Sequence, residues 1–450
     1  MTDTICAIAT SVGVSAINII KISGPKAVSI VNSLFTSDLT TKKTGTINYG
    51  FIKNSGEIID EVLVSIFIAP NSSTGEDVIE INSHGGISVT NKILELLLTN
   101  GCRLAEPGEF LKRSFLNGKK DLLEAESISD LINAKTEVAR KMSTKGIAGD
   151  LSKIIKNLRE TLLNIIANIE VNIDYPEYED AIIYTNELLK SKIEEINKLL
   201  NKIVKESDKG TLIKNGINVG IIGKPNVGKS SLLNKLINEE KAIVTNVAGT
   251  TRDIVEGTIL VNGINLNLID TAGIRETDDI VEKIGVEKSK NIIEKSDLVI
   301  ALFDGSRYFD EDDLEILENL KDKKVIVLIN KIDLEQKLDK TKLKGYNTIE
   351  VSIKENKGIE EILDKIEKLF NLEEIENSDY TYLSNARQIS IIKECLNIGK
   401  EIEKQNELNT PVDLIQIDLQ RLWEKLGELT GETYKEELLD EIFSKFCLGK

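Results

Sequence analysis

A glycine-rich loop set between a strand and a helix constrains this chain more than any other feature of the sequence. Gly223–Ser230 reads Gly-Lys-Pro-Asn-Val-Gly-Lys-Ser and matches the pattern G-x-x-x-x-G-K-[ST]. An apolar run, Val219–Ile222, precedes the loop, and Ser231–Asn234 opens a helix after it. Glycines let backbone N–H groups curl around phosphate oxygens, and the helix N-terminus adds a favourable dipole. The sequence therefore predicts a phosphate-binding loop in an α/β domain.

Individual side chains of this loop have predictable roles. Lys229 is expected to reach the β- and γ-phosphates of a nucleotide, and the Ser230 hydroxyl to ligate Mg²⁺. The rest of the loop and the first residue after it are expected to surround the phosphates: Asn226, Val227, Gly228 and Ser231.

Two further motifs follow in the order that a nucleotide switch requires. Asp270-Thr271-Ala272-Gly273 comes directly after the predicted strand Asn265–Ile269. Its aspartate can hold Mg²⁺ through water, and the Gly273 N–H can sense the γ-phosphate. Thr250-Thr251 lies between the phosphate-binding loop and the Asp270 motif, where a switch threonine contacts Mg²⁺ and the γ-phosphate.

The purine is selected by a later motif. Asn330-Lys331-Ile332-Asp333 follows the predicted strand Val325–Ile329. The Asp333 carboxylate can accept hydrogen bonds from the N1–H and the N2 amine of guanine, which adenine cannot supply, so we expect GTP and not ATP. Ser352-Ile353-Lys354 is expected to form the last base contact, with the backbone N–H of Ile353 reaching the guanine carbonyl.

The group that orients the attacking water is left open by the motifs. Ile274 stands where a Ras-like glutamine would follow Asp-Thr-Ala-Gly, so another group must do this work. Acidic residues just beyond it are the candidates: Glu276, Asp278, Asp279 and Glu282. No arginine finger is identifiable.

The pattern of apolar residues changes three times along the chain. Residues 1–118 alternate short strands with turns, 119–214 have helical spacing, 215–375 alternate strands with helices, and 376–450 return to helix. Short helices need tertiary partners, so the two helical parts are expected to pack together, with the nucleotide domain inserted between them. Predicted elements include the strands Ser15–Lys21, Glu61–Ile68, Val78–Ile81 and Glu350–Ile353 and the helix Thr185–Glu206.

Bulk properties narrow the class of protein. No run of about 18 apolar residues exists, and the N-terminus lacks the basic start of a signal peptide, so a cytoplasmic location is expected. Four scattered cysteines and one histidine make a zinc site or a disulfide framework unlikely on spacing alone. The net charge of −17 argues against a broad basic surface for nucleic acid.

With these residues in view, the whole chain resembles the MnmE (TrmE) family of tRNA-modification GTPases. The resemblance rests on the switch stretch Thr245–Asp253 and on Gly273-Ile274-Arg275-Glu276 in the nucleotide domain. Outside that domain it rests on short motifs near both ends of the chain: Thr74–Asp77, Pro107–Phe110, Phe115–Lys119 and Phe446–Lys450. The implied fold is multidomain α/β plus all-α: an N-terminal α/β folate-binding-like and dimerisation domain, a split helical domain, and an inserted Ras-like P-loop GTPase domain.

The resemblance also implies an activity and its partners. The family hydrolyses GTP to GDP during carboxymethylaminomethyl or aminomethyl modification of the wobble uridine of tRNA. It acts as a homodimer with an MnmG-like FAD protein, in a heterotetramer, so FAD belongs to the partner. The implied one-carbon donor is a tetrahydrofolate derivative, 5-formyl- or methylene-tetrahydrofolate.

Several site residues are implied by position within the family's motifs. K⁺ takes the place of an arginine finger and is surrounded by Asn226, Thr245, Val247 and Thr250, while Glu282 orients the water. Glu282, Lys229 and Thr251 are then the catalytic group. The switch residues implied to contact the nucleotide are Thr245, Asn246, Val247, Ala248, Gly249, Thr250 and Thr251, with Asp270, Thr271, Ala272 and Gly273 beyond them.

Folate contacts are implied at four positions near the two ends of the chain: Lys21, Glu80, Lys119 and Lys450. Glu80 would hydrogen-bond the pterin amide edge, and the lysines would pair with the glutamate tail. Lys21 keeps the charge of the arginine found in relatives but lacks its planar fork.

Two other classes of function fit parts of the sequence. An Era- or Der-like ribosome-assembly GTPase would be a binding switch without tRNA chemistry, but it would need a basic RNA-binding domain. A folate-dependent one-carbon transferase of the aminomethyltransferase type would use the GTPase for regulation. Folate binding by the N-terminal region separates these alternatives.

Overall fold

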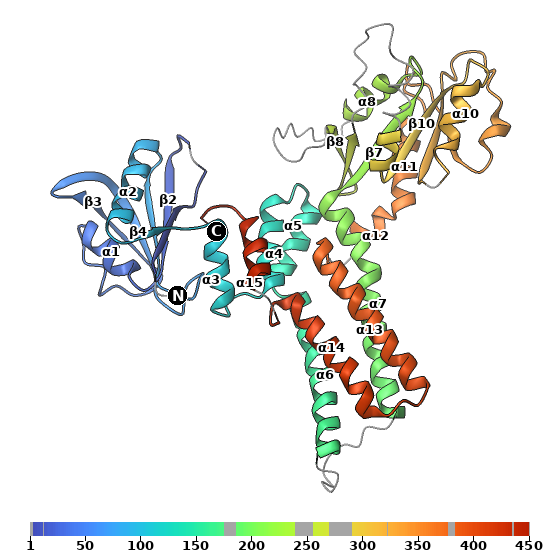
Figure 1. The fold of residues 1–450 in the computed structure, drawn as a ribbon. Helices are drawn as coiled ribbons and strands as arrows, with labels where there is room; N and C mark the ends of the chain where they lie inside the picture. Colours follow the sequence, from blue (N-terminus) through green and yellow to red (C-terminus); the bar gives the residue numbers. More distant parts are fainter. Residues whose placement is uncertain are drawn as a thin grey trace. The chain divides into compact units, whose positions relative to one another are not determined.

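The computed structural model describes residues 3–11, 13–174, 186–238, 255–269, 290–321, 323–376, 383–433 and 436–449. The chain forms two compact units. One unit contains Met1–Ile132, Thr144–Leu200 and Ile391–Lys450, and the other contains Asn133–Ser143 and Asn201–Ser390. Each unit has its own six-stranded sheet, drawn in blue for the first unit and in green to orange for the second in Figure 1.

The sheet of the first unit has the strand order β3-β4-β5-β2-β1-β6. Its neighbours pair antiparallel except β1 and β6, which are parallel. The strands are β1 (Ile5–Ile8), β2 (Ile17–Ser23), β3 (Thr46–Asn54), β4 (Glu57–Phe67), β5 (Val78–His84) and β6 (Arg103–Leu104). Lys21 and Glu80 are direct cross-strand partners in the register of β2 and β5.

One face of this sheet is covered by two helices, α1 (Ala27–Leu34) and α2 (Ile87–Thr99). Ile20 and Ile22 of β2 are fully buried in the core that these helices close. Because successive side chains of a strand alternate between faces, Lys21 lies on the opposite face. There its ammonium stands 5.0 Å from the ring centroid of Phe110.

The remainder of the first unit is helical. Its helices include α3 (Glu109–Leu116), α4 (Leu122–Asn133), α6 (Asp150–Asp174), α14 (Val412–Thr430) and α15 (Glu436–Ser444). Helix α5 (Glu137–Ile147) belongs mostly to the second unit, whose core contains its residues Val138 and Met142. Helices α6 and α14 lie side by side (Figure 1). Between them the buried Arg159 guanidinium stacks on Trp423 at 4.3 Å, donates to the Trp423 carbonyl and pairs with Glu432.

Two long helices, α7 (Asn186–Asn215) and α13 (Ala386–Glu407), are joined by a buried polar contact. Asn197 Nδ2 donates to the Gly399 carbonyl and to Glu403, each at 3.0 Å. A Cβ at position 399 would stand 2.0 Å from Asn197 Oδ1, so any other residue there would have to displace this side chain and its hydrogen bonds. Helix α7 continues to Asn215 and ends at Gly216, which has a φ of +76°. The predicted helix Thr185–Glu206 is thus too short at its C-terminal end.

The sheet of the second unit has the order β12-β11-β10-β7-β9-β8, parallel except for the antiparallel edge pair β8–β9. Its strands are β7 (Ile217–Gly223), β8 (Val255–Val261), β9 (Ile264–Ile269), β10 (Leu298–Asp304), β11 (Val325–Asn330) and β12 (Asn347–Glu350). Its helices include α8 (Lys229–Asn238), α10 (Glu311–Glu318), the 3-10 turn η1 (Lys340–Leu343), α11 (Ile359–Phe370) and α12 (Leu372–Glu376).

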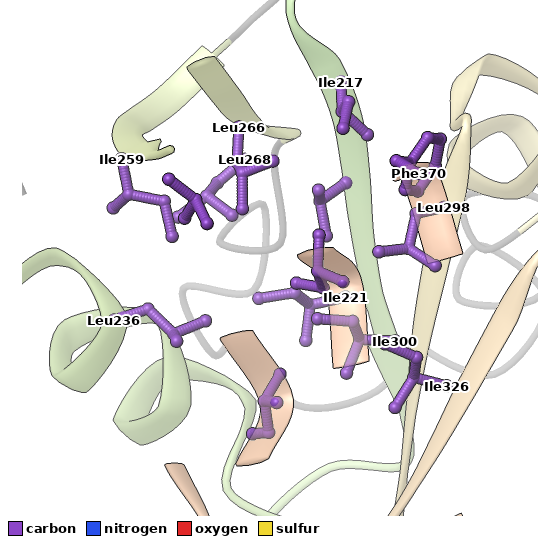
Figure 2. Packing of buried hydrophobic residues seen from close by; sticks show 14 of the residues in the cluster. Ile217, Ile221, Leu236, Ile259, Leu266, Leu268, Leu298, Ile300, Ile326 and Phe370 are labelled. Carbon is purple, nitrogen blue, oxygen red and sulfur yellow. The ribbon is translucent and has the colours of Figure 1, made fainter. Parts of the chain in front are cut away.

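Both faces of this sheet are buried. Along β10, Leu298, Ile300 and Leu302 enter one core while Val299, Ala301 and Phe303 enter the other. Figure 2 shows Ile221, Ile300 and Ile326 gathered in the first of these cores, from three adjacent strands. A strand buried on both faces reads as a continuous apolar run, which is why the sequence indicated a parallel sheet.

The predicted fold class is confirmed, with local differences. The predicted strand Glu350–Ile353 is wrong, because β12 ends at Glu350. Ser352 and Lys357 exchange backbone hydrogen bonds of 3.1 and 3.0 Å, which turns the chain into a loop instead. Strands β1, β3, β6 and β8 had not been predicted. Across the described ranges, no helix is long and apolar enough to cross a membrane.

Candidate nucleotide-binding site

The phosphate loop connects the end of β7 to the start of α8, as its motif requires. Three of its residues have positive φ: Gly223 (+147°), Asn226 (+63°) and Gly228 (+108°). At Gly228 a side chain is excluded twice, because its φ is left-handed and because a Cβ would stand 2.5 Å from Asn330 Nδ2. The loop conformation thus depends on the residues that define the motif.

Lys229 is oriented into the loop by the loop's own backbone. Its ammonium donates to the carbonyls of Gly223 and Lys224 at 2.6 and 2.7 Å. Burial lowers the pKa of Lys229 below its ordinary value. An ammonium whose partners among the described residues are two carbonyls is well placed to gain from the negative charge of a phosphate.

Asn226 and Ser230 are exposed and offer oxygen ligands beside this ammonium. Ser230 is the second residue of α8, where the helix dipole is positive. Side-chain oxygens of this kind suit hard cations such as Mg²⁺. These two residues therefore fit the ion roles expected of them.

An ion pair that joins the phosphate loop to the start of α10 was not predicted from the sequence. The Lys224 ammonium pairs with Asp310, and lies 3.3 Å from Asp312 and 3.5 Å from Asp313. Asp310 is the N-cap of α10, and its side chain accepts from the Asp313 N–H. The run of acids from Asp310 to Asp313 was the available signal, but acids at the start of a helix are ordinarily explained by capping alone.

The base-contact motif is joined directly to the phosphate loop. Asn330, at the end of β11, donates from Nδ2 to the Val227 carbonyl at 2.7 Å. Its Oδ1 accepts from the Ile353 N–H at 3.2 Å. The sequence predicted that this N–H reaches the guanine carbonyl. In the structure it is already bonded to Asn330, so a base contact requires that bond to be shared or released.

Asp333 faces solvent at the same edge of the sheet. Its carboxylate accepts from Ser352 Oγ at 2.8 Å, and this hydrogen bond lowers the pKa of Asp333 below its ordinary value. The group is therefore ionised at neutral pH and able to accept further hydrogen bonds. Lys354 is exposed beside it, and the Lys331 ammonium is held 2.6 Å from Asp304.

Much of the predicted switch machinery lies outside the described residues. This applies to every switch residue named above, to the proposed water-orienting carboxylate, and to the last residue of the chain: Thr245, Asn246, Val247, Ala248, Gly249, Thr250, Thr251, Asp270, Thr271, Ala272, Gly273, Glu282 and Lys450. The assigned roles of these residues stay predictions.

The folate positions that are described lie close together on the first unit. Lys21 and Glu80 are opposite each other and partly buried. Ser23 follows Lys21 by two residues in β2, and its Oγ lies 2.7 Å from Thr74 Oγ1. The exposed Lys119 packs beside Gly75, the residue after Thr74. The Glu80 carboxylate and the Lys21 ammonium therefore lie on adjacent strands, and Lys119 lies on a segment that contacts the loop before β5. This set of charges fits a ligand with both a polar ring edge and acidic groups.

The C-terminal tail returns to the same sheet. The Gly108 N–H donates to the Cys447 carbonyl at 3.3 Å, and a Cβ on Gly449 would stand 2.7 Å from the Ile8 carbonyl. The neighbour of Ile8 in β1, Ala7, is the register partner of Lys21. Gly449 therefore lies next to the strand pair that carries Lys21.

Comparisons with known proteins cover the whole chain. The family model described as the GTP-binding protein TrmE N-terminus matches residues 4–119, and the MnmE helical domain model matches residues 122–447. A tRNA modification GTPase MnmE from Lactococcus lactis subsp. lactis (strain IL1403) is 49% identical over 449 residues, covering 100% of this chain and 98% of that protein. Its counterpart from Streptococcus mutans serotype c is 48% identical over 450 residues, covering 100% and 99%.

Among solved structures, the G domain of the T. maritima FeoB iron transporter is 33% identical and has a TM-score of 0.26. It covers 34% of this chain and 97% of its own length. The full-length identity to the two relatives, together with both family models, is decisive. The chain belongs to the family of tRNA modification GTPases MnmE.

Proposed function

We propose that this GTPase hydrolyses GTP in support of wobble-uridine modification of tRNA, together with an MnmG-like FAD protein. The observation that carries the proposal is the junction of the phosphate loop and the base loop, where Asn330 bonds Val227 and Asp333 presents an ionised carboxylate. This geometry suits a guanosine nucleotide, and full-length relatives bear the name of a tRNA modification GTPase.

Within this site we assign the nucleotide's phosphates to the loop amides and Lys229, and its base to Asn330, Lys331, Asp333 and the loop from Ser352 to Lys354. Mg²⁺ is assigned to Ser230 and Thr251, and K⁺ to Asn226, Thr245, Val247 and Thr250. When bound, the two cations offset charge that develops on the phosphates. Glu282 is assigned to hold the attacking water.

We further assign a tetrahydrofolate derivative to the sheet of the first unit. Lys21 and Glu80 face each other across β2 and β5, and Lys119 stands beside Gly75. The tail from Cys447 to Gly449 runs against this sheet, which supports a role for Lys450 in the same place.

The domain roles in this proposal are those of the family. Residues 1–118 bind folate and dimerise, 119–214 and 376–450 form the helical domain, and 215–375 form the G domain. The assembly is a homodimer that joins its FAD partner in a heterotetramer and contacts tRNA mainly within that complex. Its place of action is the cytoplasm.

The proposal is tested in two steps. GTP hydrolysis by the purified chain is measured in K⁺ and in Na⁺ at equal ionic strength, and we expect much faster turnover in K⁺. Equal rates would remove the K⁺ assignment and leave the GTPase in place. Mass spectrometry of wobble uridine in cells lacking this protein tests the tRNA role, and unchanged modification would overturn it.

A further inference from the structure

A carboxylate from a neighbouring strand holds the lysine of the base loop. Asp304 is the last residue of β10 and is the register partner of Asn330, the last residue of β11. Its Oδ2 accepts from the Lys331 ammonium at 2.6 Å. None of the nucleotide motifs in the sequence includes Asp304.

Asp304 is itself fixed on several sides. Its exposed fraction is 7%, and its Oδ1 accepts from the Ser306 N–H at 3.0 Å and from Ser306 Oγ at 2.6 Å. Arg307 Nε lies 3.3 Å from Oδ2. Burial acts to raise the pKa of Asp304, but the hydrogen bonds from Lys331 and Ser306 outweigh it and the pKa is lowered. The carboxylate is therefore a rigid anion at neutral pH.

The two loops that follow β10 and β11 are also joined through their backbones. The Gly305 N–H donates to the Asn330 carbonyl at 2.8 Å, and the Lys337 N–H donates to the Gly305 carbonyl at 2.8 Å. Gln336 Nε2 closes the loop by donating to the Lys331 carbonyl at 3.0 Å. The backbone on either side of Lys331 is thus held in place, and its side chain is the part that still needs an anchor.

Lys331 has a conformation that a lysine does not adopt without support. Its φ is +65°, a left-handed value that costs free energy for a residue with a side chain. Its neighbours Asn330 and Asp333 are oriented by bonds to Val227 and Ser352. The bond to Asp304 fixes the tip of the Lys331 side chain, and the side chain as a whole stays 32% exposed to solvent.

We propose that Asp304 is a positioning residue for nucleotide binding: it holds the Lys331 ammonium so that the methylene stem is ready as an apolar surface for the face of the purine. This rests on the proposed function of Asn330, Lys331 and Asp333 as the base site. A long side chain fixed before binding loses less rotamer freedom when the nucleotide arrives, so affinity rises without a direct contact from Asp304.

Because a stem that packs on the face of the ring does not read its edge, the proposal makes a distinctive prediction. Asp304→Asn should weaken binding of fluorescent GDP and of IDP by the same factor, about tenfold, or roughly 1.4 kcal/mol. The turnover number at saturating GTP should change by less than about twofold, because Asp304 touches no group assigned to the phosphates.

The test is a double-mutant cycle on the full chain with Asp304→Asn, Lys331→Met and the double variant. We expect Asp304→Asn to lose its effect in the Lys331→Met background. Glu350→Gln is the matched control, since it removes the same charge from an exposed ion pair with Lys340 in the same unit and should leave affinity unchanged. Should Asp304→Asn fail to fold, Ser306→Ala removes the hydroxyl bond to Asp304 Oδ1 while keeping the backbone N–H bond, and should weaken GDP binding by about threefold.

Three results decide the proposal. Undiminished loss from Asp304→Asn in the Lys331→Met background would overturn it, because Asp304 would then act on the fold and not through Lys331. Unchanged affinity in both Asp304→Asn and Ser306→Ala would also overturn it. Failure of the wild-type chain to bind guanosine nucleotides would instead overturn the proposed base site, so the two failures are distinguishable.

Discussion

Replacing Arg113 with methionine tests whether a buried ion network holds the sheet of the first unit together. The Arg113 side chain is 0% exposed and donates to three carboxylates, those of Asp3, Glu76 and Glu109, at 2.8 to 3.2 Å. Its Nε is buried without a hydrogen-bond partner in the described part of the chain. Methionine has a similar length and no charge, so Arg113→Met removes the cation with little change in volume.

The size of the effect follows from what each carboxylate retains. Glu109, 7% exposed, keeps its ion pair with Arg103 and its hydrogen bond from the Glu106 N–H, so its buried charge is still compensated in the variant. Glu76, 13% exposed, keeps one hydrogen bond from Ser23 at 2.8 Å and loses its ionic partner. Breaking a buried pair from one side costs about 3–5 kcal/mol, and the remaining partners place this variant near 3 kcal/mol.

The effect should also depend on pH. Within the network, burial raises the pKa of Glu109, but hydrogen bonds from Arg103, Glu106 and Arg113 outweigh it, so its folded pKa lies below the ordinary 4.5. A depressed folded pKa stabilises the fold above pH 4.5, and this stability is lost as the pH falls through the folded pKa. Arg113→Met reduces that stabilisation, so the difference between wild type and variant should be largest at neutral pH and shrink as the pH falls below 4.5 towards the folded pKa of Glu109.

Hydrogen exchange on the full chain measures this locally, which suits a multidomain protein that does not unfold in one step. Amides of β2 and β5 should exchange with an opening free energy lower by about 3 kcal/mol in Arg113→Met. Lys92→Met is the matched control, because it breaks an exposed pair with Glu95 in the same unit and should change little. A loss below about 1 kcal/mol at neutral pH, or a loss that stays constant as the pH is lowered stepwise through the acid range, would refute the reasoning.

Three further predictions concern the nucleotide site. Gly228→Ala should weaken GDP binding by tenfold or more in a fluorescence titration, since its φ of +108° and the 2.5 Å approach to Asn330 both exclude a Cβ, whereas Gly345→Ala, with a φ of +100° and open space, should bind normally. Asp333→Asn should shift preference from guanosine towards xanthosine nucleotides in a competition assay, and retained guanosine preference would mean that the base contact lies elsewhere. Glu282→Ala should keep nucleotide affinity while slowing turnover, and unchanged steady-state hydrolysis would return the water-orienting role to Glu276, Asp278 or Asp279.

The phosphate loop and the parallel sheet could be predicted from the sequence because their determinants are local. Gly228 and Lys229 belong to a contiguous motif, and β10 is a continuous apolar run that is buried on both faces. Boundaries were harder to predict: the helix α7 continues nine residues beyond Glu206, to Asn215, straight through Gly210, and ends only at Gly216, which has a φ of +76°. Propensity alone does not decide where a helix with buried partners ends.

Contacts between distant residues could not be predicted in the same way. Arg113 reaches Asp3 across 110 positions and Glu76 across 37, and a single sequence does not indicate which of its many acids will be the partner. The same holds for the Ile353 N–H, which could be assigned to the loop but not to its bond with Asn330. Asp304 was overlooked because an aspartate after an apolar strand is common at the start of any loop.

The stacking of Arg159 on Trp423 between α6 and α14 has a practical consequence, since Trp423 is the only tryptophan in the chain. Its indole belongs to the first unit, and the nucleotide loops belong to the second. Intrinsic tryptophan emission is therefore an optical reporter of the helical pair and of nothing else. A change in that emission when GTP is added to the unlabelled protein would be a direct sign that the state of the nucleotide reaches a helix interface in the other unit.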